Sequence, residues 1–295
     1  MESFVDKIAV ITGGGDGMGR SLARQLSSEG CHVALCDLFP ETAAETAAAC
    51  EAGAPAGTRV TSHACDVSDP AQLRAFRDEV ADQHGADHVN LLFNNAGIGG
   101  NGSFVTDEPA AWERTFDVCW GGVYHGTRTF LPMLIAADDA HLVNTSSVNG
   151  FWASIGPDRP HTSYSAAKFA VKGFTEALIT DLAINAPHVG VSVVMPGHIG
   201  TGIVGNSQLA HGMEWGPDGV EASNLFRALA PTTSDAAATV ILDGVRAKQW
   251  RILIGEDAHV LDKAVRDAPE EAYDHDFRDR LGGHMGGILP QPNET

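Results

Sequence analysis

Short runs of apolar, often β-branched residues alternate along the chain with longer alanine-rich segments whose polar residues fall on one face. Runs of the first kind favour buried strands, and segments of the second kind favour amphipathic helices. Strands are predicted over 7–12, 32–37, 59–65, 89–94, 141–146, 189–195 and 250–254. Helices are predicted over 17–29, 40–52, 70–84, 109–136, 162–186 and 234–248. This alternation is typical of an α/β fold, in which helices cover both faces of a parallel sheet.

Three places depart from the regular alternation. Pro132 lies late in the segment 109–136, where it is expected to kink or end the helix. Residues 198–230 carry several glycines between a strand and the next helix, and their length suits a mobile substrate lid. Residues 256–295 form a C-terminal extension, of which 258–281 could be helical and the last fourteen residues flexible unless a neighbouring subunit holds them.

The composition fits one large domain and excludes several classes of function. The chain has 295 residues, 43% of them hydrophobic, which is enough for a single α/β core. Its net charge of -19 would repel nucleic acid and anionic membranes. The five cysteines are never spaced as CxxC, so neither a disulfide framework nor a zinc site is indicated. The 13 histidines show no ligand spacing either, and no metal is expected.

The N-terminal residues MESFVDKIAVITGG lack the basic segment and cleavage site of a secretory signal. No stretch of the chain reaches the length of a membrane span. A cytoplasmic protein with reduced, buried cysteines is therefore expected.

A glycine-rich turn, TGGGDGMG, follows the first predicted strand and opens the first predicted helix. Such a turn lets backbone N–H groups and the positive end of the helix dipole approach a pyrophosphate. A tight turn without a ligand is the alternative, but the position directly after the first strand favours a dinucleotide site. The residues expected to contact the cofactor here are Gly13, Gly15, Asp16, Gly17, Met18 and Gly19.

The second predicted strand ends at Asp37, where an acidic side chain can bind the hydroxyls of an adenosine ribose. A cap or turn role is the alternative for this residue. Asp16 adds a second carboxylate in the glycine loop, and no arginine or lysine directly follows Asp37. Because two carboxylates would repel a 2′-phosphate, NAD is favoured over NADP.

The stretch YSAAK places Tyr164 and Lys168 on one face of a predicted helix, since residues four apart are neighbours there. An ordinary surface pair is the alternative. A lysine beside a phenol favours the phenolate and lowers a pKa that is about 10 in free tyrosine. Such a pair could exchange protons near neutral pH.

Further motifs follow in order: CDV at 65–67, NNAG at 94–97, SSVNG at 146–150 and PGHIGT at 196–201. Together with the glycine loop, Asp37 and YSAAK, this set resembles the short-chain dehydrogenase/reductase family over about residues 6–255. The resemblance implies a three-layer, doubly wound Rossmann fold over 1–255, with a mainly parallel seven-stranded sheet in the order 3-2-1-4-5-6-7. It also implies a homodimer or homotetramer formed through the helices at about 109–136 and 162–186.

The resemblance assigns catalytic roles to three residues. Tyr164 would be the general acid/base, Lys168 would lower the pKa of Tyr164 and bind the nicotinamide ribose, and Ser147 would hydrogen-bond the reacting oxygen. Ser146 would support the strand end. The other cofactor contacts that the resemblance implies are Asp66, Val67, Asn94, Ala96, Gly97, Pro196, Gly197, Ile199 and Thr201.

The sequence departs from the family pattern at Cys119, which lies in FDVCWGG where the family usually has an asparagine. A thiol is a weak donor and a weak acceptor, so a side-chain role in catalysis is lost or weakened. In the family, a main-chain carbonyl at this irregular turn is thought to hold a water near the lysine. We expect that relay to survive, helped by Gly121 and Gly122. A nucleophilic or redox-sensing Cys119 would need a nearby cation or helix N-terminus, and the sequence suggests neither.

The expected activity is hydride transfer between nicotinamide and a hydrophobic secondary alcohol or ketone. Apolar residues in the predicted lid suit a bulky substrate such as a terpenoid, an aryl alcohol or a steroid; they are Ile203, Val204, Leu209, Met213 and Trp215. Phe151 and Trp152 could contact a substrate ring or pack in the core. The GPDRP turn before Tyr164 should reshape one wall of the cleft.

Two alternative functions are an NAD-binding sensor and a serine hydrolase. A catalytically idle NAD-binding sensor on the same fold stays open because Cys119 replaces the family asparagine. A serine hydrolase is disfavoured because the chain has no GxSxG elbow. His161 and His198 lie near the predicted cleft, where structural roles are expected.

Overall fold

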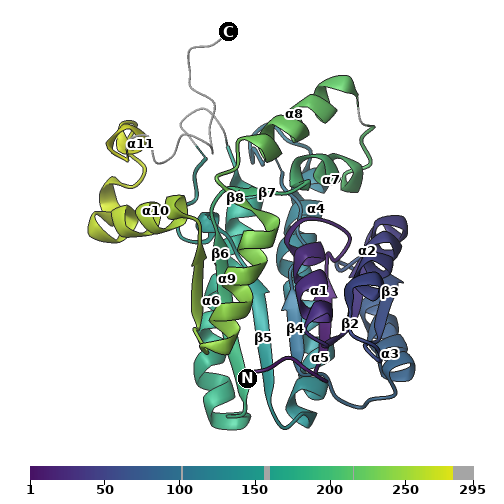
Figure 1. The fold of residues 1–295 in the computed structure, drawn as a ribbon. Helices are drawn as coiled ribbons and strands as arrows, with labels where there is room; N and C mark the ends of the chain where they lie inside the picture. Colours follow the sequence, from purple (N-terminus) through teal and green to yellow (C-terminus); the bar gives the residue numbers. More distant parts are fainter. Residues whose placement is uncertain (101, 156–159, 215, 282–295) are drawn as a thin grey trace.

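The computed structural model describes residues 1–100, 102–155, 160–214 and 216–281. Its centre is a seven-stranded sheet in the order β3-β2-β1-β4-β5-β6-β9, and every neighbouring pair in it is parallel. Helices cover both faces of this sheet (Figure 1). The predicted three-layer α/β fold and its strand order are therefore confirmed, with β9 as the seventh strand of the sheet.

The predicted strands match the observed ones to within two residues at each end. The main sheet is built from β1 Ile8–Thr12, β2 His32–Asp37, β3 Val60–Ala64, β4 Leu91–Asn94, β5 Ala140–Thr145, β6 Val189–Pro196 and β9 Arg251–Ile254. Strands β1, β4 and β5 are buried along their whole length, which explains their continuous apolar runs. Two short strands that the pattern did not predict, β7 Ile199–Gly200 and β8 Thr232–Thr233, pair separately.

The helices also follow the predicted ranges, with one division. They are α1 Gly17–Ser28, α2 Pro40–Gly53, α3 Pro70–His84, α4 Pro109–Phe116, α5 Gly122–Ala136, α6 Thr162–Asn185, α7 Ile203–Ala210, α8 Pro217–Ala228, α9 Ser234–Arg246, α10 Glu256–Asp267 and α11 Phe277–Arg280. The segment predicted as one helix over 109–136 is split into α4 and α5 by a π-helical turn, Asp117–Gly121. Pro132 does not end α5, which continues to Ala136.

Apolar side chains form a core on each face of the sheet. One core packs Ile11 of β1 against helices α1 and α9, and the other packs Phe76 of α3 against Phe130 of α5. Burying one such side chain stabilises the fold by about 1.5–3 kcal/mol. Helices thus pack on both faces of the sheet, and the carboxyl ends of its parallel strands remain free to form a site.

A third apolar cluster attaches the C-terminal extension to the loop that follows β5. Trp152 packs 5.8 Å from the ring of Phe277, and its Nε1 donates a hydrogen bond of 2.7 Å to the carbonyl of Ala272. The core alternative therefore holds for Trp152. The predicted helix over 258–281 is found as α10 and α11 with a short 3-10 helix, Pro269–Glu271, between them, and residues 282–295 lie outside the described residues.

The region expected to be a lid contains α7 and α8, which lie at the end of the sheet where the strands terminate (Figure 1). None of the helices in the described part of the chain has the length and apolar character needed to cross a lipid bilayer. All five cysteines are buried and unpaired. Among the described residues, no cluster of acidic, histidine or cysteine side chains has the geometry of a metal site.

Replacing Phe277 by alanine should release the C-terminal extension, because loss of a buried phenylalanine costs about 3–5 kcal/mol of packing free energy. Hydrogen exchange over 256–281 should rise while the central sheet keeps its protection. Phe104→Ala is the matched control, since that side chain is 78% exposed. Equal protection of 256–281 in both variants would contradict this attachment.

Candidate active site

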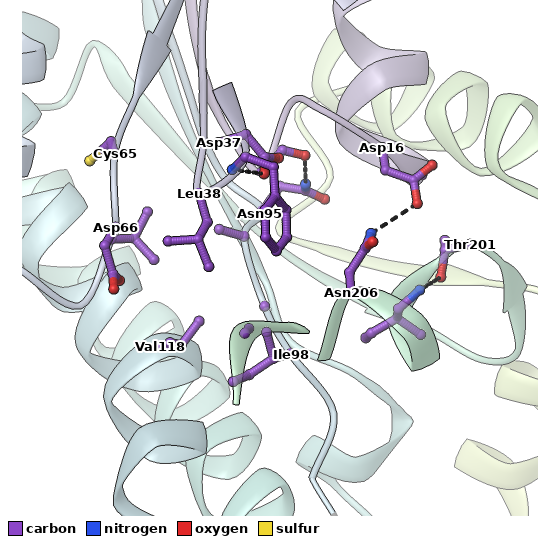
Figure 2. A pocket seen from close by; sticks show the side chains of 18 of the residues that line it. Asp16, Asp37, Leu38, Cys65, Asp66, Asn95, Ile98, Val118, Thr201 and Asn206 are labelled. Atoms are coloured by element: carbon purple, nitrogen blue, oxygen red, sulfur yellow. Dashed lines mark hydrogen bonds between the residues drawn. The ribbon is translucent and has the colours of Figure 1, made fainter. Parts of the chain in front are cut away.

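A long cleft crosses the carboxyl edge of the sheet. A cavity of about 160 Å³ at one end is lined by the glycine loop, Asp37 and Asp66, and is shown in Figure 2. A larger cavity of about 1010 Å³ contains Ser147, Tyr164 and Lys168. Both cavities share lining residues, including Met18, Asn95, Gly97, Thr201 and Ile203. They are therefore the two ends of one cleft.

The glycine loop packs too tightly for side chains at two of its positions. Gly13 has a positive φ of 65°, and a Cβ on it would lie 2.8 Å from Cα of Ala96. A Cβ on Gly19 would lie 2.0 Å from the carbonyl oxygen of Gly13. Gly13, Gly17 and Met18 line the cleft, whereas Gly15 and Gly19 lie behind it. The loop therefore presents its backbone to the cleft, as a pyrophosphate site requires.

Asp37 lies at the far end of the smaller cavity. Its Oδ2 accepts a hydrogen bond of 2.9 Å from the Gly15 N–H, and its Oδ1 accepts one of 3.1 Å from the Phe39 N–H. Burial raises the pKa of this carboxyl group, and the two backbone donors oppose that effect. Asp37 thus fills the turn role and also presents a carboxylate to the cleft.

Asp16 lines the smaller cavity and also contacts the lid region. Its Oδ2 accepts hydrogen bonds from the Gly202 N–H at 3.1 Å and from Asn206 Nδ2 at 3.0 Å, and lies 3.5 Å from the Arg227 guanidinium. Figure 2 shows Asp16 pointing toward Asn206. Asp16 lines the smaller cavity together with Asp37, so both carboxylates are present there, and Arg227 partly balances the charge of Asp16. We call these contacts the Asp16 latch.

Asp66 and Val67 line the smaller cavity as expected, but the Asp66 carboxylate already has partners. Ser68 donates to its Oδ1 at 2.7 Å, and Arg114 lies 2.8 Å from its Oδ2. Arg114 also lines both cavities, and its Nε donates to the carbonyl of Ala210 at the end of α7. Sequence reasoning did not predict that Arg114 lines the cleft, because an arginine in a short helix is ordinary.

The NNAG segment braces the central strands as predicted, and the residue that does so is Asn95. Its Nδ2 donates to the carbonyl of Thr12 at 3.1 Å, and the Asn95 and Ala96 N–H groups donate to Thr12 Oγ1. Ala96 and Gly97 line the cleft. Asn94 does not, because its side chain points into the core, where it donates to Asn144 at 2.9 Å and to Thr127 at 3.0 Å.

The expected catalytic side chains come together at the end of β5 and the start of α6. Lys168 Nζ donates to the carbonyl of Thr145 at 2.9 Å and lies 5.3 Å from the centroid of the Tyr164 ring. Ser147 and Tyr164 line the same cavity, and the Ser147 side chain favours the ionised form of the Tyr164 phenol, which lowers its pKa. Ser146 donates to the Lys168 carbonyl at 2.8 Å and so supports the strand end as predicted.

Burial determines the electrostatics of this group. It raises the pKa of the Tyr164 phenol, the nearby Cys119 thiol adds to that effect, and the Ser147 side chain opposes it. Burial also lowers the pKa of Lys168, which Cys119 opposes. Removal from water thus favours the neutral form of both groups in the protein alone, and the expected lowering of the Tyr164 pKa by Lys168 stays a prediction.

Cys119 lies in the π-helical turn, so the irregular turn is present without the asparagine. Its thiol is fully buried and donates to the carbonyl of Ile98 at 3.1 Å. A Cβ on Gly97 would lie 3.7 Å from Cys119 Sγ and 3.4 Å from Lys168 Nζ. The side chain thus packs beside the lysine, and its burial gives no support to a nucleophilic role.

The PGHIGT loop lines the larger cavity through Pro196, Gly197, Ile199 and Thr201, as expected. The loop is held from behind by Asp257 of α10, whose Oδ2 accepts the His198 N–H at 2.7 Å. A Cβ on Gly197 would lie 2.2 Å from that oxygen. The role of Asp257 was not predicted from the sequence, because nothing in the extension indicated contact with the cleft.

The lid residues divide between the cleft and the surface. Ile203, Val204 and Met213 line the larger cavity, whereas Leu209 does not. Phe151 packs against the third apolar cluster rather than in the cleft. Trp215 and most of the GPDRP turn, residues 156–159, lie outside the described residues.

The shape and chemistry of the cleft fit a dinucleotide. A backbone cradle at Gly13 and Gly17 lies between a carboxylate at one end and Lys168 at the other. A side chain on Gly13 would collide with Ala96, so the glycine at this position keeps the backbone cradle open.

Residues 7–211 match the family model described as short chain dehydrogenase. The chain belongs to the short-chain dehydrogenase family. SadH of Mycobacterium tuberculosis, a relative whose name describes an oxidoreductase, is 38% identical over 266 residues, which cover 90% of this chain and 92% of SadH.

Solved structures of short-chain dehydrogenases are similar to this chain. A family member from Burkholderia phymatum in complex with NAD has 31% identity and a TM-score of 0.78, covering 92% of this chain and 95% of that one. A metagenomic member in complex with NADP has 28% identity and a TM-score of 0.64, covering 85% and 98% of the two chains. The protein is thus an oxidoreductase of a family in which NAD and NADP complexes both occur.

Asp16→Ala should loosen the lid helix α7 of this dehydrogenase, because it removes the acceptor of all three contacts of the Asp16 latch. Hydrogen bonds to a charged group are each worth about 1.5–3 kcal/mol, so exchange of α7 amides should rise by about tenfold or more. Hydrogen exchange measured by mass spectrometry tests this. The control is Asp78→Ala, whose carboxylate contacts only the adjacent Arg77. Unchanged protection of 203–210 would show that the latch does not hold the lid.

Proposed function

We propose that this protein is an NAD-dependent oxidoreductase that transfers hydride between the nicotinamide and a hydrophobic secondary alcohol or ketone. The observation that carries the proposal is the position of Ser147, Tyr164 and Lys168 on the wall of a cavity that continues into the glycine-loop cleft. A bound nicotinamide supplies the hydride donor or acceptor. The chain itself supplies proton exchange, orientation and exclusion of water.

Tyr164 is proposed as the general acid/base. Tyr164 and Ser147 line the same cavity, so both hydroxyl groups can converge on one substrate oxygen. In reduction Tyr164 gives its proton to the carbonyl oxygen, and in oxidation it takes the proton of the alcohol. Ser147 holds the same oxygen by a hydrogen bond, and this bond strengthens as negative charge develops.

Lys168 is proposed to adjust Tyr164 rather than to touch the substrate. The protein alone keeps the phenol protonated, since burial raises its pKa. Beside the positive charge of an oxidised nicotinamide, both Lys168 and the cofactor ring favour the phenolate. Tyr164 would then become a base only when the cofactor is ready to accept hydride.

Asp37 supports a preference for NAD. Its carboxylate lines the cavity where the adenosine ribose of the cofactor would lie, and it can accept hydrogen bonds from the 2′- and 3′-hydroxyl groups. A 2′-phosphate there would meet a like charge. Asp16 lines the same cavity and adds a second carboxylate, whose charge Arg227 partly balances.

A bulky apolar substrate is supported by the larger cavity. Its volume of about 1010 Å³ lies at the upper end for ligand pockets, and it must also hold the nicotinamide. Apolar side chains come from three directions: Trp112 from α4, Ile155 from the loop after β5, and Val204 from α7. A catalytically idle sensor would not need Ser147, Tyr164 and Lys168 in one cavity. Their common position therefore favours an enzyme.

We also propose that the protein is a homodimer or homotetramer formed through α5 and α6. Ile135 at the end of α5 and Phe169 and Ile184 on α6 are exposed apolar residues, and Ile184 is 72% exposed. Exposed apolar side chains on neighbouring helices mark an interaction surface.

The proposed function is tested by turnover of a panel of secondary alcohols and ketones with each cofactor, using wild type, Tyr164→Phe and Asp37→Ala. Wild type should prefer NAD, Tyr164→Phe should lose activity by about 10²–10⁴-fold while still binding NADH, and Asp37→Ala should narrow the preference for NAD. Full activity in Tyr164→Phe would remove the assigned acid/base. A wild-type preference for NADP would remove the role of Asp37.

A further inference from the structure

Two polar side chains on the wall of the larger cavity lack hydrogen-bond partners. His161, directly before α6, and Ser163, in its first turn, both line that cavity. His161 Nδ1 and Ser163 Oγ are buried and form no hydrogen bond with any described residue. An unpaired buried polar atom costs about 1–3 kcal/mol, so such atoms in a cavity wall indicate a ligand that pairs with them.

Other polar side chains of the same wall are already bonded within the protein. Trp112 Nε1 donates to Thr162 Oγ1 at 2.9 Å, and Asn149 Nδ2 donates to the carbonyl of Trp152 at 3.0 Å. Ser207 Oγ accepts the Gly99 N–H at 2.7 Å. These groups have little capacity left for a substrate. His161 Nδ1 and Ser163 Oγ differ from these three groups because they are buried and have no hydrogen-bond partner among the described residues.

His161 also lies next to the reacting centre. The centroid of its ring is 4.7 Å from the centroid of the Tyr164 ring, with 32° between the ring planes. The two side chains are three residues apart and face the same cavity. A group bound to His161 would therefore be close to the oxygen that Tyr164 and Ser147 hold.

The partner of His161 should be uncharged. Burial lowers the pKa of His161 to about 4, so the imidazole is neutral at physiological pH. A neutral imidazole has one donor and one acceptor, which suits a hydroxyl or a carbonyl group. A carboxylate or phosphate would meet a single N–H donor on this ring, and burial disfavours the imidazolium that would balance its charge.

We propose that His161 binds a second oxygen of the substrate, carried by the carbon next to the reacting one. The proposal rests on the proposed function and gives its substrate class: bulky vicinal diols and α-hydroxy ketones, rather than simple secondary alcohols. Ser163 lies on the same wall and can share this oxygen. His161 is thus a specificity-determining residue, and Tyr164 keeps the proton transfer.

The test compares matched substrates that differ by one oxygen. 1-Phenylethane-1,2-diol is paired with 1-phenylethanol, and trans-cyclohexane-1,2-diol with cyclohexanol, each oxidised with NAD. Wild type should show kcat/KM at least about tenfold higher for the diol of each pair, since a site built to bond a hydroxyl rejects an analogue without it. His161→Phe keeps a ring against Tyr164 but removes both nitrogens. This variant should bring the ratio close to one by lowering kcat/KM for the diol only.

Two further variants separate binding from folding. His161→Asn keeps a donor and an acceptor and should restore part of the diol preference. His88→Phe, at an exposed histidine outside the cavity, should leave the ratio unchanged. Equal kcat/KM for diol and mono-alcohol in wild type, or a parallel loss for both substrates in His161→Phe, would overturn the proposal. Absence of turnover of every alcohol by wild type would instead refute the proposed function.

Discussion

The site depends on a lysine that is almost fully buried. Lys168 is 2% exposed, and its Nζ donates to the carbonyl of Thr145, a neutral acceptor that leaves the charge poorly compensated in the protein alone. Burial of Tyr164 beside it keeps the phenol neutral. Burial thus opposes ionisation of both groups in the protein alone. Such a pair costs folding free energy and is retained where function needs it, as perturbed groups at active sites generally are.

The rest of the fold serves to hold this pair at the edge of the sheet. Ser146 fixes the backbone at Lys168, Gly97 leaves room for the ammonium group, and the π-helical turn places Cys119 beside it. The lid and the C-terminal extension are tied to the same edge from opposite sides, through Asp16 and through Asp257. Cofactor site, lid and extension thus meet at residues that are far apart in sequence.

The element order, the sheet and the gathering of Ser147, Tyr164 and Lys168 could be predicted from sequence, because they depend on local periodicity and on motifs in a fixed order. The directions of single side chains could not. Asp16 lines the smaller cavity as expected, but its bonds to Gly202 and Asn206, which lie 186 and 190 residues further along the chain, could not be predicted. Asn94 turns inward because Asn144 and Thr127 offer it bonds, and Asn95 takes the bracing role. Arg114 and Asp257 act only through contacts that tertiary structure creates.

The central claim is that burial holds Tyr164 protonated until an oxidised cofactor binds. Ultraviolet difference titration of wild type against Tyr164→Phe isolates the ionisation of this phenol from that of the other two tyrosines. Without cofactor, Tyr164 should ionise above the pKa of about 10 of free tyrosine. With saturating NAD⁺ its pKa should fall below that value, and with NADH it should fall less because the reduced ring is neutral. A Tyr164 pKa that is the same with and without NAD⁺ would contradict the account.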